Sequence, residues 1–431
     1  MLFLQKIILS QKSGEAKGVF SICSANPTVL EASIKQAACE DTPLLIESTS
    51  NQVNQYGGYT GMNPKQFVKF VCSLAERQGL FRERLIIGGD HLGPNPWQNE
   101  TTINAMAKAH QLIRDCVLAG YTKIHLDTSM KCSDDNPNTP LSKEVSAQRA
   151  AELCLTAEDT FRNFVSEHKL PVYVIGTEVP PPGGHKGYDD HILITTTEDA
   201  KKTLEETKTA FKKYGIEKAW ERVIGLVVQP GVEFGDQNII EYDHQKANQL
   251  SLFIETCDNL VYEAHSTDYQ TQKSLTQMVK NHFAILKVGP ELTFAFREAV
   301  FSLANIENEL LAGKKSIKLS NIKTVVDDLM VKNPYYWSKY YCGNECDVSF
   351  ARKYSLNDRI RYYWSNIDVQ NTLKRLINNL NSNKIPLSLV SQFMPIQYKK
   401  IREGKLGNSP NEWIEHNIGL VLLKYAQACR N

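Results

Sequence analysis

Short runs of hydrophobic residues recur along the chain up to about residue 290. Each run is too short for a helix and too continuous for a half-exposed strand, a pattern typical of strands buried on both faces of a parallel sheet. Eight runs fit this description: 18–24, 43–47, 85–90, 123–127, 171–178, 223–229, 260–265 and 284–287. We therefore predict eight buried strands.

Segments with the period of an amphipathic helix lie between most of these runs. The first of these segments begins near residue 63, and the others cover 99–119, 142–168, 197–214, 244–257, 271–281 and 291–311. Strict alternation of strand and helix predicts a parallel sheet with right-handed crossovers. Eight such units fit a (β/α)8 barrel, the TIM barrel, better than an open doubly wound sheet, which would place a glycine-rich loop where this chain has Ser24-Ala-Asn-Pro27.

The alternation stops after Gly313, and the rest of the chain is rich in aromatic and charged residues. Helical patterns cover 317–332, 356–364, 369–379, 386–404 and 411–429. We predict that residues 1–312 form the barrel and that residues 313–431 form a helical C-terminal extension.

The composition narrows the class of protein. The 431 residues include 49 Lys+Arg and 48 Asp+Glu, for a net charge of +1, whereas nucleic-acid-binding domains are usually strongly basic. No apolar stretch is long enough to cross a bilayer, and Gln5 and Lys6 interrupt the first hydrophobic run, unlike a secretory signal. Several of the ten cysteines lie at apolar positions, as in a reducing compartment. We expect a cytoplasmic protein with no membrane or nucleic-acid partner.

Every predicted strand ends on a polar or ionisable residue. Active sites of parallel barrels lie at the carboxyl ends of the strands, and a loop by itself needs only a capping residue such as Ser or Asp. The residues at these ends are Ser24, Glu47, Asp90 with His91, Asp127, Glu178, Gln229, His265 and Lys287. So many ionisable groups at one mouth predict an active site there.

Two of these residues, His91 and His265, are the first candidates for metal ligands. Imidazoles together with carboxylate or amide oxygens suit Zn²⁺, Mn²⁺ or Co²⁺. His125 lies on the same strand face as Asp127 and is a further candidate inside the barrel. Asp90 is placed to move a proton beside such a metal. Further catalytic candidates at this mouth are Glu47, Asp127 and Glu178.

Other residues at the mouth are candidates for binding the substrate. Ser266, Thr267 and Gly289 follow the last two strands, where barrels often bind phosphate through backbone N–H groups. Lys287 is a candidate for a phosphate contact, and less typically for a Schiff base. Additional candidates are Ser24, Asn51 and Gln52. Two interpretations are open for Arg359 and Arg361. They could contact a substrate phosphate or a neighbouring subunit, or they could form a solvated helix face, which is the interpretation we favour.

Several long motifs resemble those of one known family. They cover 46–62, Gly88-Gly-Asp-His-Leu-Gly-Pro94, 175–184, 227–234, 262–271, Leu286-Lys-Val-Gly-Pro290 and 355–364. This set strongly resembles the GatZ/KbaZ family, the Z-type subunit of bacterial tagatose-1,6-bisphosphate aldolase. The resemblance implies a TIM barrel related to class II aldolases, a role in galactitol, N-acetylgalactosamine or tagatose catabolism, and a Y-type aldolase subunit as partner.

The resemblance also implies roles for individual residues. Against the class II aldolase pattern, Asp90 corresponds to the catalytic aspartate, and His91 and His265 correspond to metal ligands. Where these aldolases have their remaining histidine ligand, this chain offers Gln229, and Glu178 is expected to compensate. Zinc is the metal that we expect, with Mn²⁺ or Co²⁺ as alternatives.

Three functions remain open at this stage. The first is a Z-type subunit with an intact metal-dependent ketose or ketose-phosphate site. The second is a stand-alone 4-epimerase that interconverts fructose and tagatose, free or phosphorylated, and the third is a purely non-catalytic accessory subunit. Aldol cleavage and 4-epimerisation can share one C3–C4 scission, and opposed bases such as Asp90 and Glu178 offer a route by C–H proton exchange. We also expect a homo-oligomer. A nucleotide kinase has little support, because no Gly-x-x-x-x-Gly-Lys-Ser/Thr motif occurs.

Overall fold

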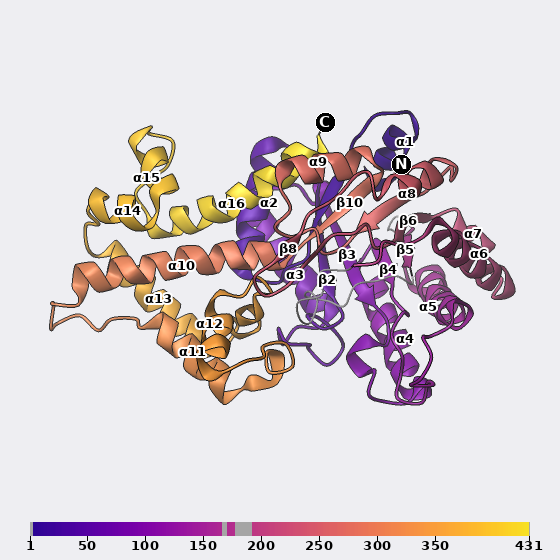
Figure 1. Ribbon diagram of the computed structural model, residues 1–431, viewed down its shortest axis with the longest axis horizontal. Helices are drawn as coiled ribbons and strands as arrows, with labels where there is room; N and C mark the ends of the chain where they lie inside the picture. Colours follow the sequence, from indigo (N-terminus) through magenta and orange to yellow (C-terminus); the bar gives the residue numbers. More distant parts are fainter. Residues whose placement is uncertain (1–2, 166–169, 177–191, 431) are drawn as a thin grey trace.

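The computed structural model describes residues 3–165, 170–176 and 192–430 (Figure 1). Its centre is a closed barrel of parallel strands in the order β1-β10-β9-β6-β5-β4-β3-β2. The strands are β1 (Val19–Ile22), β2 (Leu44–Thr49), β3 (Leu85–Leu92), β4 (Lys123–Leu126), β5 (Val172–Gly176), β6 (Val223–Val227), β9 (Val261–Ala264) and β10 (Phe283–Val288). The eight predicted strands and the TIM barrel are confirmed.

The barrel closes between its first and last strands. Ser21 of β1 pairs with Lys287 of β10 on one side and with Leu45 of β2 on the other. Almost every strand position is buried, which explains the continuous hydrophobic runs. Gly88 in β3 leaves space for its neighbour, since a Cβ there would lie 2.8 Å from the Glu47 carboxylate. A short hairpin, β7 (Glu233–Phe234) with β8 (Ile239–Ile240), follows β6.

Helices surround the barrel in the expected alternation. Those matching predicted segments are α3 (Pro64–Gln78), α4 (Thr102–Ala119), α5 (Lys143–Phe164), α6 (Thr197–Lys213), α8 (Asn248–Glu255), α9 (Gln272–Lys280) and α10 (Pro290–Leu311). Asn63 starts α3 through a capping box with Gln66. The pattern did not predict α1 (Phe3–Lys12), α2 (Pro27–Glu40) or α7 (Glu217–Trp220). The buried face of α2 includes small residues such as Ala32, Ser33 and Ala37, which give a weak hydrophobic signal.

The C-terminal segment is helical, as expected, but divided differently. It contains α11 (Ile322–Lys332), α12 (Glu345–Tyr354), the 3-10 helix η4 (Arg359–Tyr363), α13 (Ile367–Asn381), α14 (Leu387–Phe393), α15 (Pro395–Arg402) and α16 (Pro410–Cys429). The predicted helix 386–404 is two helices because Pro395, without an N–H, begins a new one. The predicted helix 356–364 is instead the short η4, and α12 was not predicted.

The C-terminal segment touches the barrel at two places. Helix α16 returns to the barrel beside α2 and α9, where the Tyr425 ring lies 5.9 Å from that of Phe20 and the N–H of Gly18 donates to Cys429 O (Figure 1). At the mouth, the Tyr269 hydroxyl donates to Leu356 O at 2.7 Å, just before η4. Residues far along the chain are thereby carried to the barrel opening. None of the described helices is both long and apolar enough to span a membrane.

Candidate metal and substrate site

Three histidines meet at the carboxyl ends of the strands. His91 is the last residue but one of β3, His125 lies in β4 and His265 directly follows β9. The ring centroids are 4.8 Å apart for His91 and His265, and 5.2 Å apart for the two pairs with His125. The barrel therefore brings together side chains from three separate strands, as predicted for the mouth of a TIM barrel.

Four buried residues of this cluster could hold a metal ion. Asp90, His125, Glu263 and His265 each offer one donor atom, and these atoms lie within 4.8 Å of one another. His125 Nδ1 is 3.0 Å from Asp90 Oδ1, and His265 Nε2 is 3.1 Å from Glu263 Oε1. His125 Nε2 is buried and has no hydrogen-bond partner among the described residues. Two imidazoles and two carboxylates fit a divalent ion such as Zn²⁺, Mn²⁺ or Co²⁺.

His91, which the resemblance implies is a metal ligand, lies beside this four-residue group. Its Nδ1 is 2.7 Å from Asp127 Oδ2, and its Nε2 is 3.2 Å from His265 Nδ1. Asp127, a predicted catalytic residue, thus orients the His91 ring from a buried position. His91 has a φ of +48° at an irregular point of the β3–β4 pairing, so its backbone departs from regular strand geometry. In this geometry His91 adjoins the four-residue group and contacts His265.

Gln229, the other expected ligand, is turned away from this group. Its side-chain Oε1 accepts hydrogen bonds from the N–H groups of Gly231, at 2.8 Å, and Val232, at 3.1 Å. The amide therefore stabilises its own turn, and the carboxylate of Glu263 from the neighbouring strand belongs to the four-residue group instead. Glu178, expected as ligand and base, lies outside the described residues.

A buried layer of opposite charges lies beneath the mouth. Lys123 Nζ is 2.6 Å from both Glu47 Oε1 and Glu263 Oε2. Lys287 forms an ion pair with Glu47 and lies 3.1 Å from Asp90 Oδ1 and 3.6 Å from Glu263 Oε1. Glu47, predicted to be catalytic, is fully buried and serves as the counter-ion of both lysines. Paired charges of this kind offset the desolvation cost of burial.

These contacts determine the protonation of the site. Burial by itself raises the pKa of Asp90, but His91, Lys287 and His265 outweigh it and hold that pKa well below its usual range. Burial lowers the pKa of His265 to about 4, so its ring is neutral and able to bind a metal near pH 7. Although burial opposes it, the surrounding acids Asp90, Glu263 and Glu47 raise the pKa of Lys287 well above its usual value. The protonated amine is no nucleophile, which disfavours a Schiff base.

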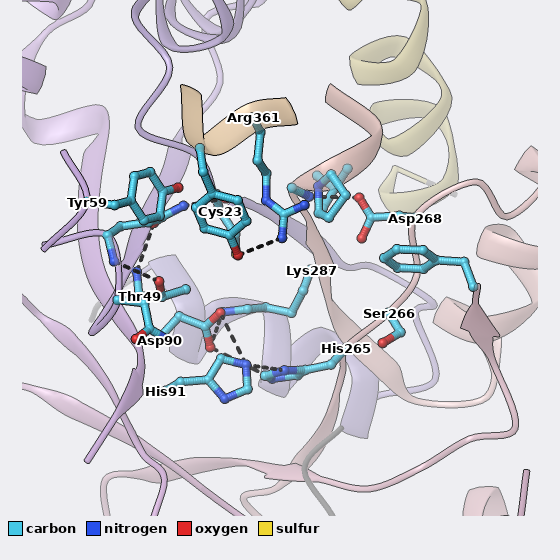
Figure 2. A pocket seen from close by; sticks show the side chains of 17 residues that line it. Cys23, Thr49, Tyr59, Asp90, His91, His265, Ser266, Asp268, Lys287 and Arg361 are labelled. Carbon is cyan, nitrogen blue, oxygen red and sulfur yellow. Dashed lines mark hydrogen bonds and ion pairs between the residues drawn. The ribbon is translucent and has the colours of Figure 1, made fainter. Parts of the chain in front are cut away.

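A pocket of about 90 Å³ opens above these residues (Figure 2). Asp90, His91 and His265 lie on one side of it, and Lys287 lies across its floor. Among the predicted substrate-binding residues, the pocket is lined by Asn51, Gln52, Lys287, Ser266 and Gly289. Ser24 lies in an adjoining pocket of about 270 Å³. Thr267 is not a lining residue, because its buried hydroxyl donates to the carbonyl of Lys287.

The C-terminal segment completes the wall of this pocket. Arg361 and Tyr362 of η4 line it together with Tyr59, whose ring centroid is 4.7 Å from that of Tyr362. Arg359 is buried, with its guanidinium 3.3 Å from the centroid of the Tyr340 ring. The favoured interpretation of Arg359 and Arg361 as a solvated helix face is therefore wrong. In the sequence, only the dense mixture of arginine and aromatic residues around them indicates that they are buried at a site.

Asp268 is another pocket residue that the strand ends did not indicate. Its Oδ1 accepts the N–H groups of Gly289 and Glu291, both at 2.9 Å, at the start of α10. Burial raises the pKa of this carboxyl to about 7, and the two N–H bonds only partly offset that effect. The N–H group of Gly289, one of the predicted phosphate contacts, thus already has a partner within the chain.

Comparisons with known proteins agree with the sequence motifs. A crystal structure from Sinorhizobium meliloti 1021, described as a probable tagatose 6 phosphate kinase, is 42% identical, with a TM-score of 0.86 over 96% of this chain and 100% of that one. The YdjI aldolase of Escherichia coli K12 matches at 9% identity and a TM-score of 0.43, over 89% of this chain and 99% of the other. A fructose-bisphosphate aldolase of Campylobacter jejuni matches at 14% identity and a TM-score of 0.44, over 88% of this chain and 92% of the other. Similarity at the level of these two aldolases carries no argument about function.

One comparison covers almost the whole chain. The family model for the D-tagatose-1,6-bisphosphate aldolase subunit GatZ/KbaZ-like proteins matches residues 4–430. The match includes the strands that carry the histidine cluster and the C-terminal segment that walls the pocket. The chain belongs to the GatZ/KbaZ-like family.

Proposed function

We propose that this protein is a metal-dependent enzyme that breaks the C3–C4 bond of a ketose. An aldolase would release the two fragments, and an epimerase would join them again. One observation carries the proposal: Asp90, His125, Glu263 and His265 form a buried donor group that opens onto a pocket. A purely accessory barrel needs neither the neutral imidazole of His265 nor an ionised aspartate beside it. The family resemblance supports a ketose as the substrate class.

His125, Glu263 and His265 of the donor group would hold a divalent cation, which would supply a Lewis acid for the C2 carbonyl of the sugar, and Asp90 beside them is available as a base. Asp90 lines the pocket, and its low pKa keeps it ionised near neutral pH, so its carboxylate can accept the proton of the C4 hydroxyl. As that proton leaves, the C3–C4 bond breaks, C4 becomes an aldehyde, and the bonding electron pair is delocalised from C3 into the C2 carbonyl.

The fate of the aldehyde separates the two reactions. Its release is aldol cleavage. Its rotation within the pocket, attack by C3 on the other face and return of the proton from Asp90 give the 4-epimer. Both outcomes use the same residues to break the bond. Lys287, whose Nζ lies 3.1 Å from Asp90 Oδ1, stabilises the negative charge of the Asp90 carboxylate. Asn51, Gln52 and Ser266 are available to bind hydroxyls.

The test uses the purified chain alone. Bound metal is measured by mass spectrometry, and the protein is incubated with fructose, tagatose, their 6-phosphates and their 1,6-bisphosphates while NMR follows the products. We expect about one tightly bound divalent ion per chain and turnover of at least one sugar, lowered at least 100-fold in Asp90→Asn. The exposed Asp258→Asn is the matched control. Protein without metal and without turnover would contradict the proposal.

The family description favours a second candidate, because it names an aldolase subunit. In that case the chain acts by activating a Y-type catalytic subunit. The same variants separate the candidates: an accessory chain would stimulate a Y-type aldolase equally well with Asp90 or Asn at this position. An enzyme would lose its own activity in the variant whether or not the partner is added.

A further inference from the structure

The carboxyl of Asp268 lies across the pocket from Asp90 (Figure 2). Its Oδ1 accepts the N–H groups of Gly289 and Glu291 and so caps the start of α10. Its other oxygen, Oδ2, has no hydrogen-bond partner among the described residues and faces the pocket. The cap needs one acceptor oxygen only, which an asparagine would also supply. The second oxygen is therefore available for chemistry in the pocket.

The loop between β9 and α9 holds this carboxyl in place. Two of its residues, Ser266 and Tyr269, have φ values of +53° and +65°, in the left-handed region that side chains other than glycine rarely adopt. Thr267 between them is fixed by its hydroxyl, which donates to Lys287 O at 2.5 Å. Such a backbone persists only where its surroundings hold it, and active sites are common places for it. The loop thus keeps Asp268 at a fixed position in the pocket wall.

Burial and neighbouring acids keep the Asp268 carboxyl protonated up to about neutral pH. Burial raises its pKa to about 7, and the charge of Glu291 acts in the same direction. Lys424 opposes this effect, but its Nζ forms an ion pair with Glu291 Oε1 at 2.5 Å. Glu233 is another buried acid nearby, and burial raises its pKa to about 7 as well. Oδ2 of Asp268 can therefore carry a proton and release it near neutral pH, as a general acid must.

Other ionisable groups of the pocket are less suited to donate a proton. Asp90 is ionised and serves as the base of the proposed reaction. The two histidines that line the pocket belong to the donor group or adjoin it. Lys287 has a pKa well above its usual value, because three acids surround its amine, and burial raises the pKa of the Cys23 thiol in the same way. Both groups hold their protons too tightly near pH 7.

We propose that Asp268 is the acid that protonates C3 after the C3–C4 bond has broken, so that the reaction ends in aldol cleavage. The proposal rests on the proposed function, in which the electron pair of the broken bond passes from C3 into the C2 carbonyl. Oδ2 of Asp268 gives its proton to C3, the C2 carbonyl re-forms, and C3 becomes a CH₂OH group. Asp90 then releases to solvent the proton of the C4 hydroxyl, and Asp268 takes up one from solvent. Epimerisation needs no proton at C3, because C3 attacks the aldehyde again.

Deuterium exchange tests this step by itself. The zinc-loaded protein is incubated in D₂O with dihydroxyacetone or dihydroxyacetone phosphate, and NMR follows the loss of the C–H signal of the carbon that corresponds to C3. The step run backwards removes a proton from this carbon and returns a deuteron. We expect exchange with at least one probe, slowed at least 10-fold in Asp268→Asn and less than twofold in the exposed control Asp258→Asn. Exchange as fast in Asp268→Asn as in the unmodified protein would overturn the proposal.

Turnover of a ketose gives a second comparison. Asp268→Asn should release the aldehyde at least 10-fold more slowly than the unmodified protein, because C3 is no longer protonated. The 4-epimer should still form in this variant, since Asp90 alone exchanges the proton of the C4 hydroxyl. An equal loss of cleavage and epimerisation would place the effect of Asp268 before bond scission and would contradict the proposal.

The metal-free protein provides a measurement that does not depend on turnover. The infrared difference between the unmodified protein and Asp268→Asn at pH 5.5 should contain the C=O band of a protonated carboxyl, and absence of this band would overturn the proposal. Asparagine keeps the acceptor oxygen of the cap, so the melting temperature should change little. If Asp268→Asn does not fold, Asp268→Ser replaces it, because a serine hydroxyl caps a helix but releases no proton near neutral pH.

These results separate the proposal from the proposed function. If the unmodified protein neither exchanges deuterium nor converts any sugar, the proposed function is refuted and the role of Asp268 falls with it. If it converts a ketose to the 4-epimer without any exchange, the proposed function stands and only the role of Asp268 is wrong.

Discussion

Replacing Lys123 by methionine tests whether the charged layer beneath the mouth is as interdependent as the distances indicate. The side chain is fully buried, and its Nζ lies 2.6 Å from a carboxylate oxygen of both Glu47 and Glu263. Methionine keeps an unbranched stem of similar length but removes the charge. Two buried carboxylates then share Lys287 alone. Removing one partner of a buried ion pair costs roughly 3–5 kcal/mol, a large part of the roughly 5–15 kcal/mol that stabilises a typical protein.

The loss of stability should depend on pH. Burial raises the pKa of Glu263, and Lys123 is the largest of the opposing influences that hold it well below its usual value. In Lys123→Met the folded-state pKa of Glu263 therefore rises. A carboxyl whose pKa is higher in the folded than in the unfolded protein takes up a proton on folding, and that stabilising contribution is lost as the pH rises through the folded-state pKa. The variant should lose less stability at pH 5.5 than at pH 8.

Urea denaturation followed by circular dichroism measures this effect, in EDTA so that metal binding does not contribute. The matched control is Lys405→Met, which removes an exposed lysine whose Nζ lies 3.0 Å from Glu403. Exposed ion pairs contribute little, so the control should unfold at nearly the midpoint of the unmodified protein. Equal midpoints for the two variants, or the same loss at both pH values for Lys123→Met, would refute the reasoning.

Three further predictions concern a buried acid, the metal group and a glycine. Burial raises the pKa of Asp358 to about 7, so the folded protein loses stability as the pH rises from about 4 to 7 and this carboxyl has to ionise in a buried place. Asp358→Asn should therefore stabilise the protein at pH 8 by on the order of 3 kcal/mol and have little effect at pH 4, which thermal melts at the two pH values would show. His125→Ala should weaken zinc binding at least 10-fold in a chelator competition, and the half-buried His110→Ala should not. Gly93→Ala places a Cβ 1.7 Å from Asp127 O and should lower the melting temperature by several degrees, whereas Gly419→Ala in α16, with no atom within 4 Å of the added Cβ, should raise it slightly. A melting temperature unchanged by Gly93→Ala, a pH-independent effect of Asp358→Asn or full zinc affinity in His125→Ala would each contradict its prediction.

The sequence by itself determined the barrel and the position of its mouth. A strand buried on both faces needs a continuous apolar run, so the eight runs could be found without knowing what packs against them. The polar residues that end those runs must then gather at one end of a parallel barrel. This local logic sufficed to place Asp90, His265 and Lys287 around one site.

Only the tertiary structure decided which of these residues face one another and which bind elsewhere. Gln229 ends a strand like the others, but the N–H groups of its own turn take its amide oxygen. Glu263 has an apolar residue on each side in the sequence, and its role appears only when β9 lies beside β6 and β10. Arg361 reaches the pocket because contacts to the hairpin region and to Tyr269 hold η4 at the mouth. Strand periodicity depends on neighbours along the chain, whereas the composition of a site depends on the register, side-chain direction and long-range packing that bring distant residues within a few ångströms.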